Sequence, residues 1–491
     1  MKGSVLKKFL CTCLVTAAAF AATTISASAC TTIYVGGDLV EEGTPFVART
    51  EDYGSDYNKL WFISESGKWK QGDHYVGCPE YGPFEWDFTH DSYRFTYFTN
   101  DIYYDGICPE CGEKADHYSY TEFGTNEKGV SVSATETLYG NEKVTEADPY
   151  RDAEWAEANK SERIGIEETD IPTIILAEAS SAREGVKLLL DIYENYGCVA
   201  ASGVFVCDKD EVWYVENCSG TQYVAIKLNN MIFLEPNMAV IGRVDLDDEN
   251  VIASKDLIAV AKKAGTFVGD EAKNIIDFRA SYARISEKMD QRMIDGLNYL
   301  NATYKYDSDA LVADNTKFTI SNLDASDKLV ALYTNIKADR KLDKDDVFGY
   351  YKLSSIGKAS NQEIEIFQLF KDRPVETATV GWVGVGNMSY NVFVPYYPML
   401  IDGMYKGYQV STASAKFTTE KPDTFCTYGT SWAQDAEGNW QRVSGFKAYP
   451  SNWKDSYYFT FEGLGGYIAN AEKITGAPLK AEAKTYVADK L

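Results

Sequence analysis

Cys30 stands directly behind a segment with the features of a cleaved export signal. Three lysines lie within residues 2–8, residues 9–22 are uncharged and mostly apolar, and the segment ends in Ala27-Ser28-Ala29, the A-x-A pattern of a secretory cleavage site. Cleavage after Ala29 would free the α-amine of Cys30, whose pKa of about 7.7–8.0 lets it act as a general base near neutral pH. One residue would then supply both the thiol nucleophile and its base.

Two other roles for Cys30 are open on the sequence alone, a lipid anchor and a cysteine without function. Bacterial lipoproteins usually have Leu at the position of Ala27 and continue into a flexible polar tether. Here the chain continues into Thr31-Thr32-Ile33-Tyr34-Val35, whose β-branched and aromatic residues predict a strand. A catalytic residue needs rigid support, whereas a lipid anchor does not. We therefore favour the nucleophile.

The next segment predicts which groups surround this cysteine. Residues 45–50 read as a second strand, and glycines punctuate the connection between the two strands. If the strands form a hairpin folded near residue 40, Cys30 lies opposite about residue 50, beside Arg49, Glu51 and Asp52. Arg49 would favour the thiolate, and the Asp52 carboxylate would hold the amine. We expect Cys30 to be exposed at the end of its strand.

The motifs around these residues resemble the N-terminal-nucleophile dipeptidases of peptidase family C69. The resemblance begins with Cys30-Thr31-Thr32-Ile33 and Ala48-Arg49-Thr50-Glu51-Asp52 and extends over roughly residues 30–400. It implies a cysteine-type dipeptidase with an α+β fold, a four-layer αββα sandwich of the N-terminal nucleophile hydrolase type. The later matching segments are Thr125-Asn126-Glu127-Lys128-Gly129-Val130, Ser133-Ala134-Thr135-Glu136-Thr137, residues 171–197, Glu211-Val212-Trp213-Tyr214, Pro236-Asn237, Gly381-Trp382 and Val392-Phe393-Val394-Pro395-Tyr396-Tyr397.

The resemblance also implies further site residues. In related amidases of the bile-salt and penicillin V type two Asn side chains matter, and one corresponds to Asn237 here. The other falls at Glu136, and a carboxylate cannot donate to an oxyanion unless it is protonated, so Thr135 or backbone amides would have to substitute. A later catalytic arginine of the relatives falls at Arg279 or Arg284, of which we favour Arg284. The predicted catalytic residues are Cys30, Arg49, Asp52, Asn237 and Arg284.

Three parts of the chain position these residues. We expect a signal peptide over residues 1–29, a hydrolase core over 30–400 and an extension over 401–491 that packs on the core with additional strands and a helix. Within the core, residues 130–134, 203–207, 212–216, 223–228, 363–369 and 390–396 read as strands, and residues 182–195, 251–264 and 273–300 read as helices.

Composition limits the partners. Lys and Arg number 48 and Asp and Glu 73, so the net charge of -25 disfavours nucleic acid as a partner. Only three histidines occur, which leaves few candidates for a His-based triad, and we predict no cofactor and no catalytic metal. Cys108-Pro109-Glu110-Cys111 resembles half of a zinc knuckle, but a lone C-x-x-C is weak. No segment after the signal is long enough to span a membrane.

We therefore expect a secreted or cell-surface dipeptidase that acts on small peptides. A related N-terminal-cysteine amidase that cleaves a non-peptide acyl amide is the first alternative. A lipid-anchored binding protein, which would use the 35 tyrosines and 9 tryptophans for sugar or peptide contacts, is the second. The sequence leaves side-chain specificity undetermined, and a homo-oligomer is left open.

Overall fold

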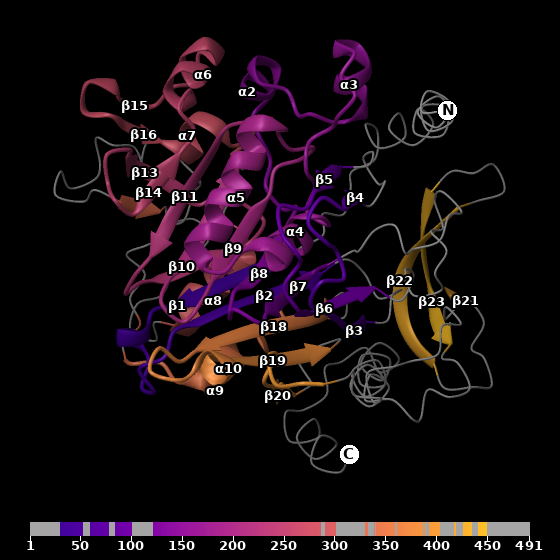
Figure 1. The fold of residues 1–491 in the computed structure, drawn as a ribbon. Coiled ribbons are helices and arrows are strands. Elements are labelled where there is room, and N and C mark those ends of the chain that lie inside the picture. The colour runs from indigo at the N-terminus through magenta and orange to yellow at the C-terminus, as the bar shows by residue number, and fades with distance from the viewer. Residues whose placement is uncertain are drawn as a thin grey trace.

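The computed structural model describes residues 30–52, 59–77, 84–100, 121–285, 290–300, 329–331, 338, 340–358, 361–385, 388, 392–402, 417–418, 426–434 and 440–448. Within these residues two antiparallel sheets lie face to face, and helices cover their outer faces (Figure 1). One sheet has six strands in the order β12-β1-β2-β18-β19-β20. The other has eight in the order β14-β11-β10-β9-β8-β7-β6-β3.

The elements that build the two sheets and their helical layers have the following bounds. The six-stranded sheet contains β1 (Thr31–Val35), β2 (Phe46–Asp52), β12 (Ile232–Glu235), β18 (Asn361–Leu369), β19 (Thr379–Val385) and β20 (Val394–Tyr396). The eight-stranded sheet contains β3 (Lys59–Ser64), β6 (Phe95–Asn100), β7 (Phe123–Asn126), β8 (Ser131–Thr135), β9 (Gly203–Cys207), β10 (Val212–Asn217), β11 (Tyr223–Leu228) and β14 (Val251–Ala253). The main helices are α4 (Ile171–Glu178), α5 (Ala182–Asn195), α8 (Gln291–Leu300) and α9 (Lys344–Tyr350).

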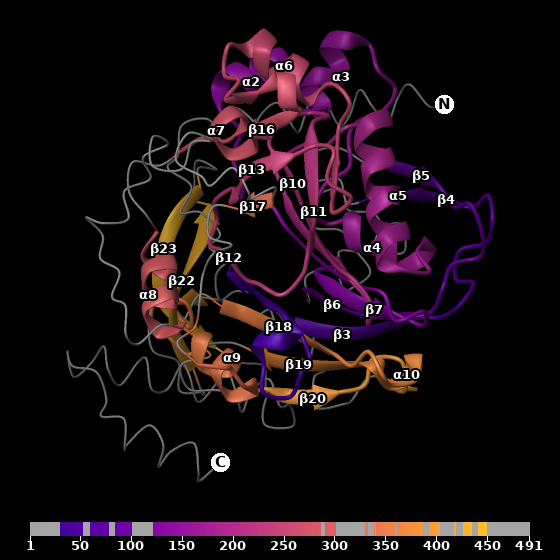
Figure 2. The same cartoon turned by 90° about the vertical axis from the view of Figure 1, so that its left-hand side faces the viewer.

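Alternation along the strands divides the interior into three apolar layers. On β9, Val204 and Val206 pack with the buried faces of α4 and α5. Phe205, between them, points to the other sheet, where its ring centroid lies 6.0 Å from that of Phe233 on β12. On β18, Ile364 and Ile366 pack instead with α8 and α9. The order helix, sheet, sheet, helix confirms the predicted four-layer α+β fold (Figure 2).

Helix α5 shows how local sequence specifies one of these layers. Ser181 stands at its N-cap, where the hydroxyl accepts a hydrogen bond from the amide of Glu184 at 3.2 Å. Its buried side chains recur at helical spacing, including Val186, Leu189 and Tyr193. The predicted bounds of this helix, 182–195, agree with the observed ones.

Two predicted helices are wrong in part. Residues 251–264 begin as strand β14, and helix α6 (Leu257–Ala264) starts only after a turn. Residues 273–300 divide into β16 (Ile275–Asp277), α7 (Phe278–Tyr282) and α8. The division arises because the Asp277 side chain accepts from the amide of Ala280 at 2.9 Å and so starts a new helix, which ends when Ala283 turns to an extended conformation.

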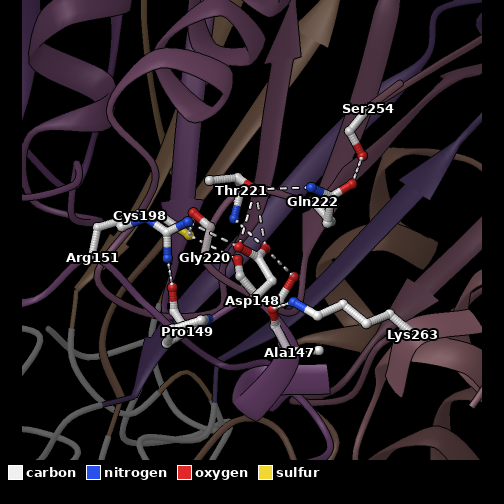
Figure 3. A network of polar contacts seen from close by, with 11 residues as sticks. Ala147, Asp148, Pro149, Arg151, Cys198, Gly220, Thr221, Gln222, Ser254 and Lys263 are labelled. Atoms are coloured by element: carbon white, nitrogen blue, oxygen red, sulfur yellow. Dashed lines mark hydrogen bonds and ion pairs between the residues drawn. The ribbon is translucent and has the colours of Figure 1, made fainter. Parts of the chain in front are cut away.

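A buried aspartate joins a peripheral helix to the eight-stranded sheet (Figure 3). Asp148 ends helix α2 (Glu142–Ala147), and its carboxylate accepts from the Ser219 hydroxyl at 2.9 Å and from the Thr221 amide at 2.7 Å. Arg151 forms an ion pair with the same carboxylate at 3.1 Å. These contacts fix the turn between β10 and β11 on the α5 side of the sheet.

The remaining elements lie around this core. They are α3 (Ala153–Asn159), α10 (Val375–Ala378), the hairpin of β4 (His74–Val76) with β5 (Glu85–Asp87), a sheet of β15 (Gly269–Asp270), β16, β13 (Ile241–Asp245) and β17 (Leu329–Ala331), and a sheet of β21 (Phe417–Thr418), β23 (Trp440–Ala448) and β22 (Cys426–Gln434). The last sheet supplies the predicted C-terminal strands. The predicted signal peptide, the C-terminal helix and Cys108 with Cys111 lie outside the described residues. None of the described helices is both long and apolar enough to cross a bilayer.

Candidate active site

The hairpin at the start of the described chain has the geometry expected from sequence. Strands β1 and β2 pair antiparallel with Thr31 opposite Thr50 and Thr32 opposite Arg49. The amide of Thr31 also donates to the Thr50 hydroxyl at 2.8 Å. Cys30 immediately precedes β1 and therefore lies beside the end of β2, as predicted.

Cys30 is buried rather than exposed, because it faces the space between the two sheets. Its relative exposure is 3%. Alternation puts it on the same side of β1 as Tyr34, which belongs to the apolar layer between the sheets. The guanidinium of Arg49 donates from Nη2 to the Cys30 sulfur at 3.5 Å, and the backbone amide of Asp52 donates to the same sulfur. The expectation of an exposed strand end overlooked the eight-stranded sheet that covers this face.

Arg49 is the centre of a buried polar cluster. Its Nη1 donates to the Ser133 hydroxyl on β8 at 3.4 Å and lies 3.7 Å from Glu365 on β18. Ser133 in turn donates to Glu365 at 2.6 Å. Nη2 contacts Glu168, in the segment before α4, at 3.4 Å. Sequence reasoning found Arg49 but missed these three partners, since each comes from a distant part of the chain.

The surroundings of Cys30 hold its thiol in the neutral form. Burial raises the pKa of the Cys30 thiol to about 11, and the negative charge of Glu168 acts in the same direction. The charge and hydrogen bond of Arg49 and the amide of Asp52 lower this pKa but do not offset burial. A thiol with such a pKa is almost entirely protonated at neutral pH, so the site needs a base to ionise it.

Asp52 lies at the end of β2 with its carboxylate buried. The carboxylate forms an ion pair with the Lys358 ammonium at 2.6 Å. Its side chain is 2% exposed, against 34% for Lys358. Asp52 is thus beside Cys30 through its backbone, and the predicted role of its carboxylate in holding the amine stays a prediction.

Asn237 reaches the site through an arginine that sequence reasoning did not name. Arg292 of α8 donates from Nη1 to the carbonyl oxygen of Cys30 at 2.8 Å and to Asn237 Oδ1 at 3.3 Å. Its Nη2 forms an ion pair with Asp290 at 2.9 Å. Asn237 follows β12 and has a φ of 50°, a left-handed conformation that Asn tolerates better than most residues. Cys30, Arg49, Asp52 and Asn237 are therefore brought together.

Arg284 is not brought to Cys30. Its guanidinium lies over the ring of Tyr139, 4.2 Å from the ring centroid, and its amide donates to the Tyr139 carbonyl at 2.7 Å. A bridge between Gly140 and Ala283 fixes this segment there. Arg292 lies in the first turn of its helix, where a positive charge opposes the helix dipole. The predicted helix over residues 273–300 concealed this placement, so no sequence signal pointed to Arg292.

Thr135 and Glu136, the positions considered for a second oxyanion donor, have other partners in the structure, and the identity of that donor stays a prediction. The Thr135 hydroxyl donates to the Thr137 hydroxyl at 2.6 Å, and Thr137 donates to Glu235 at 3.4 Å. Glu136 acts electrostatically on Tyr150 and Cys198, on the α5 side of the sheet.

Two other features of the described residues are a cluster of carboxyl groups and a surface cavity. The carboxyl groups of Glu51, Glu122 and Glu363 are buried and approach within 4.8 Å of one another. A cavity of about 910 Å³ opens on the α5 side, lined in part by Trp86, Trp155 and Tyr196. None of the residues that contact Cys30 lines it.

The chain is similar in sequence to known peptidases. The model of peptidase family C69 matches residues 29–441. The probable dipeptidase B of Streptococcus pyogenes serotype M1 is 30% identical over 398 residues, which cover 78% of this chain and 74% of that protein. The probable dipeptidase of Salmonella dublin is 28% identical over 380 residues, 75% of this chain and 81% of that protein. Among solved structures, penicillin V acylase from Agrobacterium tumefaciens is 10% identical in sequence and superposes with a TM-score of 0.30. The alignment covers 72% of this chain and 82% of that chain. A TM-score this low does not support a fold assignment. The fold is therefore assigned from the two sheets and the helical layers described above.

Proposed function

This chain belongs to peptidase family C69, and we propose on that premise that it hydrolyses dipeptides with the thiol of Cys30 as nucleophile. The family and the relatives named dipeptidase support a hydrolase that acts on peptide bonds. One observation carries the assignment to Cys30: the 3.5 Å contact between its sulfur and the guanidinium of Arg49. A fixed cation beside a sulfur stabilises the thiolate, the reactive form of cysteine.

The base in this mechanism is the α-amine of Cys30. In the full chain that nitrogen is an amide, joined to residue 29, and an amide nitrogen is not basic. Removal of residues 1–29 converts it into an amine with a pKa of about 7.7–8.0 in water. Since burial holds the pKa of the thiol at about 11, this amine would supply the proton acceptor that ionises it.

The reaction then proceeds in two balanced steps. The amine takes the thiol proton while the sulfur attacks the carbonyl carbon of the first substrate residue, which gives a tetrahedral oxyanion. The C–N bond breaks, the departing amine takes the proton from the Cys30 ammonium, and the acyl group stays on sulfur as a thioester. Water, deprotonated by the same amine, attacks the thioester and releases the first amino acid and the thiol.

Three residues would position these groups. Arg292 holds the Cys30 carbonyl at 2.8 Å and so fixes the backbone that carries the amine. It also holds Asn237 Oδ1 at 3.3 Å, which orients the amide so that its Nδ2 would serve the oxyanion. Asp52, with its backbone on the Cys30 sulfur, would orient the new ammonium group.

Export belongs to the same proposal. A signal peptide over residues 1–29 would release the mature chain outside the cytoplasm with Cys30 at its N-terminus. Signal cleavage and enzyme activation would then be one event, which keeps the peptidase inactive until it has left the compartment of synthesis. The lipid-anchored alternative differs at the same atom, because acylation of the amine would remove the base.

A substrate panel on the mature chain, residues 30–491, tests the proposal. We expect hydrolysis of dipeptides, little hydrolysis of longer peptides or N-acyl amino acids, and none by Cys30→Ala. Rapid quenching and mass analysis should find the acyl group on the peptide that begins with Cys30. Hydrolysis confined to non-peptide acyl amides would instead favour the amidase alternative, and full activity of Cys30→Ala would reject the nucleophile.

A further inference from the structure

One nitrogen of Arg49 is shared between the nucleophile and a carboxylate. Nη2 lies 3.5 Å from the Cys30 sulfur and 3.4 Å from Glu168 Oε1. The distance between the sulfur and this carboxylate oxygen therefore cannot exceed the sum of these two distances. Glu168 precedes α4, which contacts β7 and β8 of the eight-stranded sheet, whereas Arg49 belongs to the six-stranded sheet and Cys30 directly precedes its first strand.

Glu168 is also the carboxylate around Arg49 that solvent reaches. Its side chain is 20% exposed, against 2% for Arg49 and 1% for Glu365. Glu365 is further engaged by the Ser133 hydroxyl at 2.6 Å, and burial raises the pKa of its carboxyl to about 8, so it is largely neutral near pH 7. An incoming cation would therefore meet the Glu168 carboxylate before the others that contact Arg49.

The separation matches one feature of a dipeptide. The attacked carbonyl carbon and the α-ammonium nitrogen are attached to the same Cα, about 2.5 Å apart. Sulfur approaches that carbon to about 3–3.5 Å, and an ammonium contacts a carboxylate at about 2.8 Å. A path from sulfur through carbon and nitrogen to carboxylate oxygen fits the span bridged by Arg49 Nη2 when it bends at the carbonyl carbon and at the nitrogen.

We propose that Glu168 binds the α-ammonium group of the substrate, and that this contact frees Arg49 to act on the Cys30 sulfur. The inference rests on the proposed function and names its substrate class: peptides with an unblocked N-terminus. In the free enzyme Glu168 competes with the sulfur for one guanidinium nitrogen. A bound ammonium neutralises Glu168, so the same guanidinium then favours the thiolate, and binding of the correct substrate activates its own nucleophile.

N-acylated dipeptides carry no positive charge at their N-terminal nitrogen, so the ion pair between Glu168 and Arg49 would stay intact when they bind. They should therefore bind more weakly and also meet a less activated thiol.

The first test compares a dipeptide with its N-acetyl analogue on the wild-type enzyme and on Glu168→Gln, which keeps the size of the side chain and removes its charge. We expect the wild-type enzyme to prefer the free amine by about 10- to 100-fold, as a charge-assisted hydrogen bond implies. Glu168→Gln should lose most of that preference, through a higher KM for the free dipeptide and a faster reaction of the N-acetyl analogue, because Glu168 no longer competes with the sulfur for Arg49. Glu162→Gln, an exposed residue of the same segment, should keep the wild-type preference.

The pH dependence of Cys30 alkylation by iodoacetamide gives a second test. It would not change if Glu168 had a purely structural role. Removing the negative charge of Glu168 should lower the pH at which alkylation reaches half its maximal rate. A non-hydrolysable dipeptide with a free amine should lower this pH in the wild-type enzyme but not in Glu168→Gln. Equal loss of both substrates in Glu168→Gln, or an unchanged alkylation profile, would overturn the proposal. A wild-type enzyme that accepts both substrates equally through Cys30 would reject ammonium recognition while leaving the nucleophile intact. A wild-type enzyme that hydrolyses neither would reject both.

Discussion

The guanidinium of Arg49 lies 3.5 Å from the sulfur of Cys30, and the same group contacts Glu168 at 3.4 Å and Glu365 at 3.7 Å. One buried cation thus contacts a thiol and two carboxyl groups. Its charge stabilises the Glu168 carboxylate, because an anion that loses its cationic partner in a largely buried site is strongly destabilising. The nucleophile is therefore built into a polar cluster that also ties together the two sheets.

Replacement of Cys30 should abolish hydrolysis while leaving the fold intact. Cys30→Ala removes the sulfur, and we expect kcat/KM on a dipeptide to fall by at least about 10³-fold, the usual cost of losing a nucleophile. Cys30→Ser should retain at most slight activity, because a hydroxyl is a much weaker nucleophile at neutral pH. Circular dichroism and a thermal melt serve as the control for folding. A Cys30→Ala enzyme with more than about a tenth of the wild-type rate would contradict covalent catalysis by this residue.

Arg49→Lys should fail to replace the arginine. A lysine carries the charge but presents a single nitrogen, so it cannot contact Ser133, Glu168 and the Cys30 sulfur from one planar group. We expect kcat/KM to fall by about 10- to 100-fold, since at least one charge-assisted hydrogen bond is lost. Arg183→Lys is the matched control, because Arg183 pairs with Glu211 on the outer side of the sheet. Wild-type kinetics in Arg49→Lys would show that the cation acts only as a distant charge.

The hairpin that carries these residues could be predicted from sequence because it is local. Cys30 and Arg49 are nineteen positions apart. Two short strands joined by a glycine-containing connection can pair in only a few registers, so the neighbours of Cys30 could be estimated. The burial of Cys30 could not be predicted in this way, since it depends on the sheet that faces it. Ser133 and Glu365, 232 positions apart, meet only when that second sheet is in place.

The choice between Arg284 and Arg292 shows the same limit. Both lie in a stretch that reads as one long helix, and helical spacing alone does not reveal that Asp277 starts a short separate helix. The two arginines consequently face different parts of the molecule. Arg292 reaches the carbonyl of Cys30 across 262 positions, a contact that is specified by packing of α8 on the six-stranded sheet and not by any local pattern.

The pair of arginines gives a matched prediction. Arg292→Lys should lower kcat by about 10-fold or more, because the residue fixes both the Cys30 backbone and Asn237, and misplaced reacting groups lose rate steeply. Arg284→Lys should leave kcat near the wild-type value, since its guanidinium lies over Tyr139. Steady-state kinetics on one dipeptide separate the two. The reverse result, with Arg284→Lys inactive and Arg292→Lys active, would reject the assignment of Arg292 to the site.

Stability should fall as pH rises through the neutral range. Burial raises the pKa of the Glu216 carboxyl from 4.5 to about 8 and that of Glu235 to about 7. The folded state therefore holds these protons more tightly than the unfolded state. Their contribution to stability is complete below pH of about 4.5 and is lost as pH rises through about 7–8. Calorimetry between about pH 6 and 9, which extends about one pH unit beyond these two pKa values, should show a falling Tm.

Glu216→Gln isolates this effect from the general repulsion of an acidic chain. The Glu216 carboxylate accepts from the amides of Val240 and Ile241 at 2.8 and 3.2 Å, and glutamine cannot titrate there. The variant should show a shallower decline of Tm with pH, whatever its Tm at low pH. Parallel curves for the two proteins would mean that Glu216 is not the titrating group.

Activity should depend on exposing the α-amine of Cys30. A chain that retains residues 1–29 has an amide at that position, and the thiol beside it has a pKa of about 11, so it has neither an internal base nor a significant thiolate population at neutral pH. We expect this chain to fold and to be inactive, and to become active when the bond after Ala29 is cut. A form that begins with Met directly before Cys30 should gain activity in step with removal of that Met, and chemical acetylation of the mature amine should abolish activity again. Intact-mass analysis of each sample, taken alongside the rate, identifies the residue at the N-terminus and any acyl group on it. Full activity in a chain proven by mass to keep residues 1–29 would contradict the mechanism, because an amide nitrogen cannot accept the proton of the thiol.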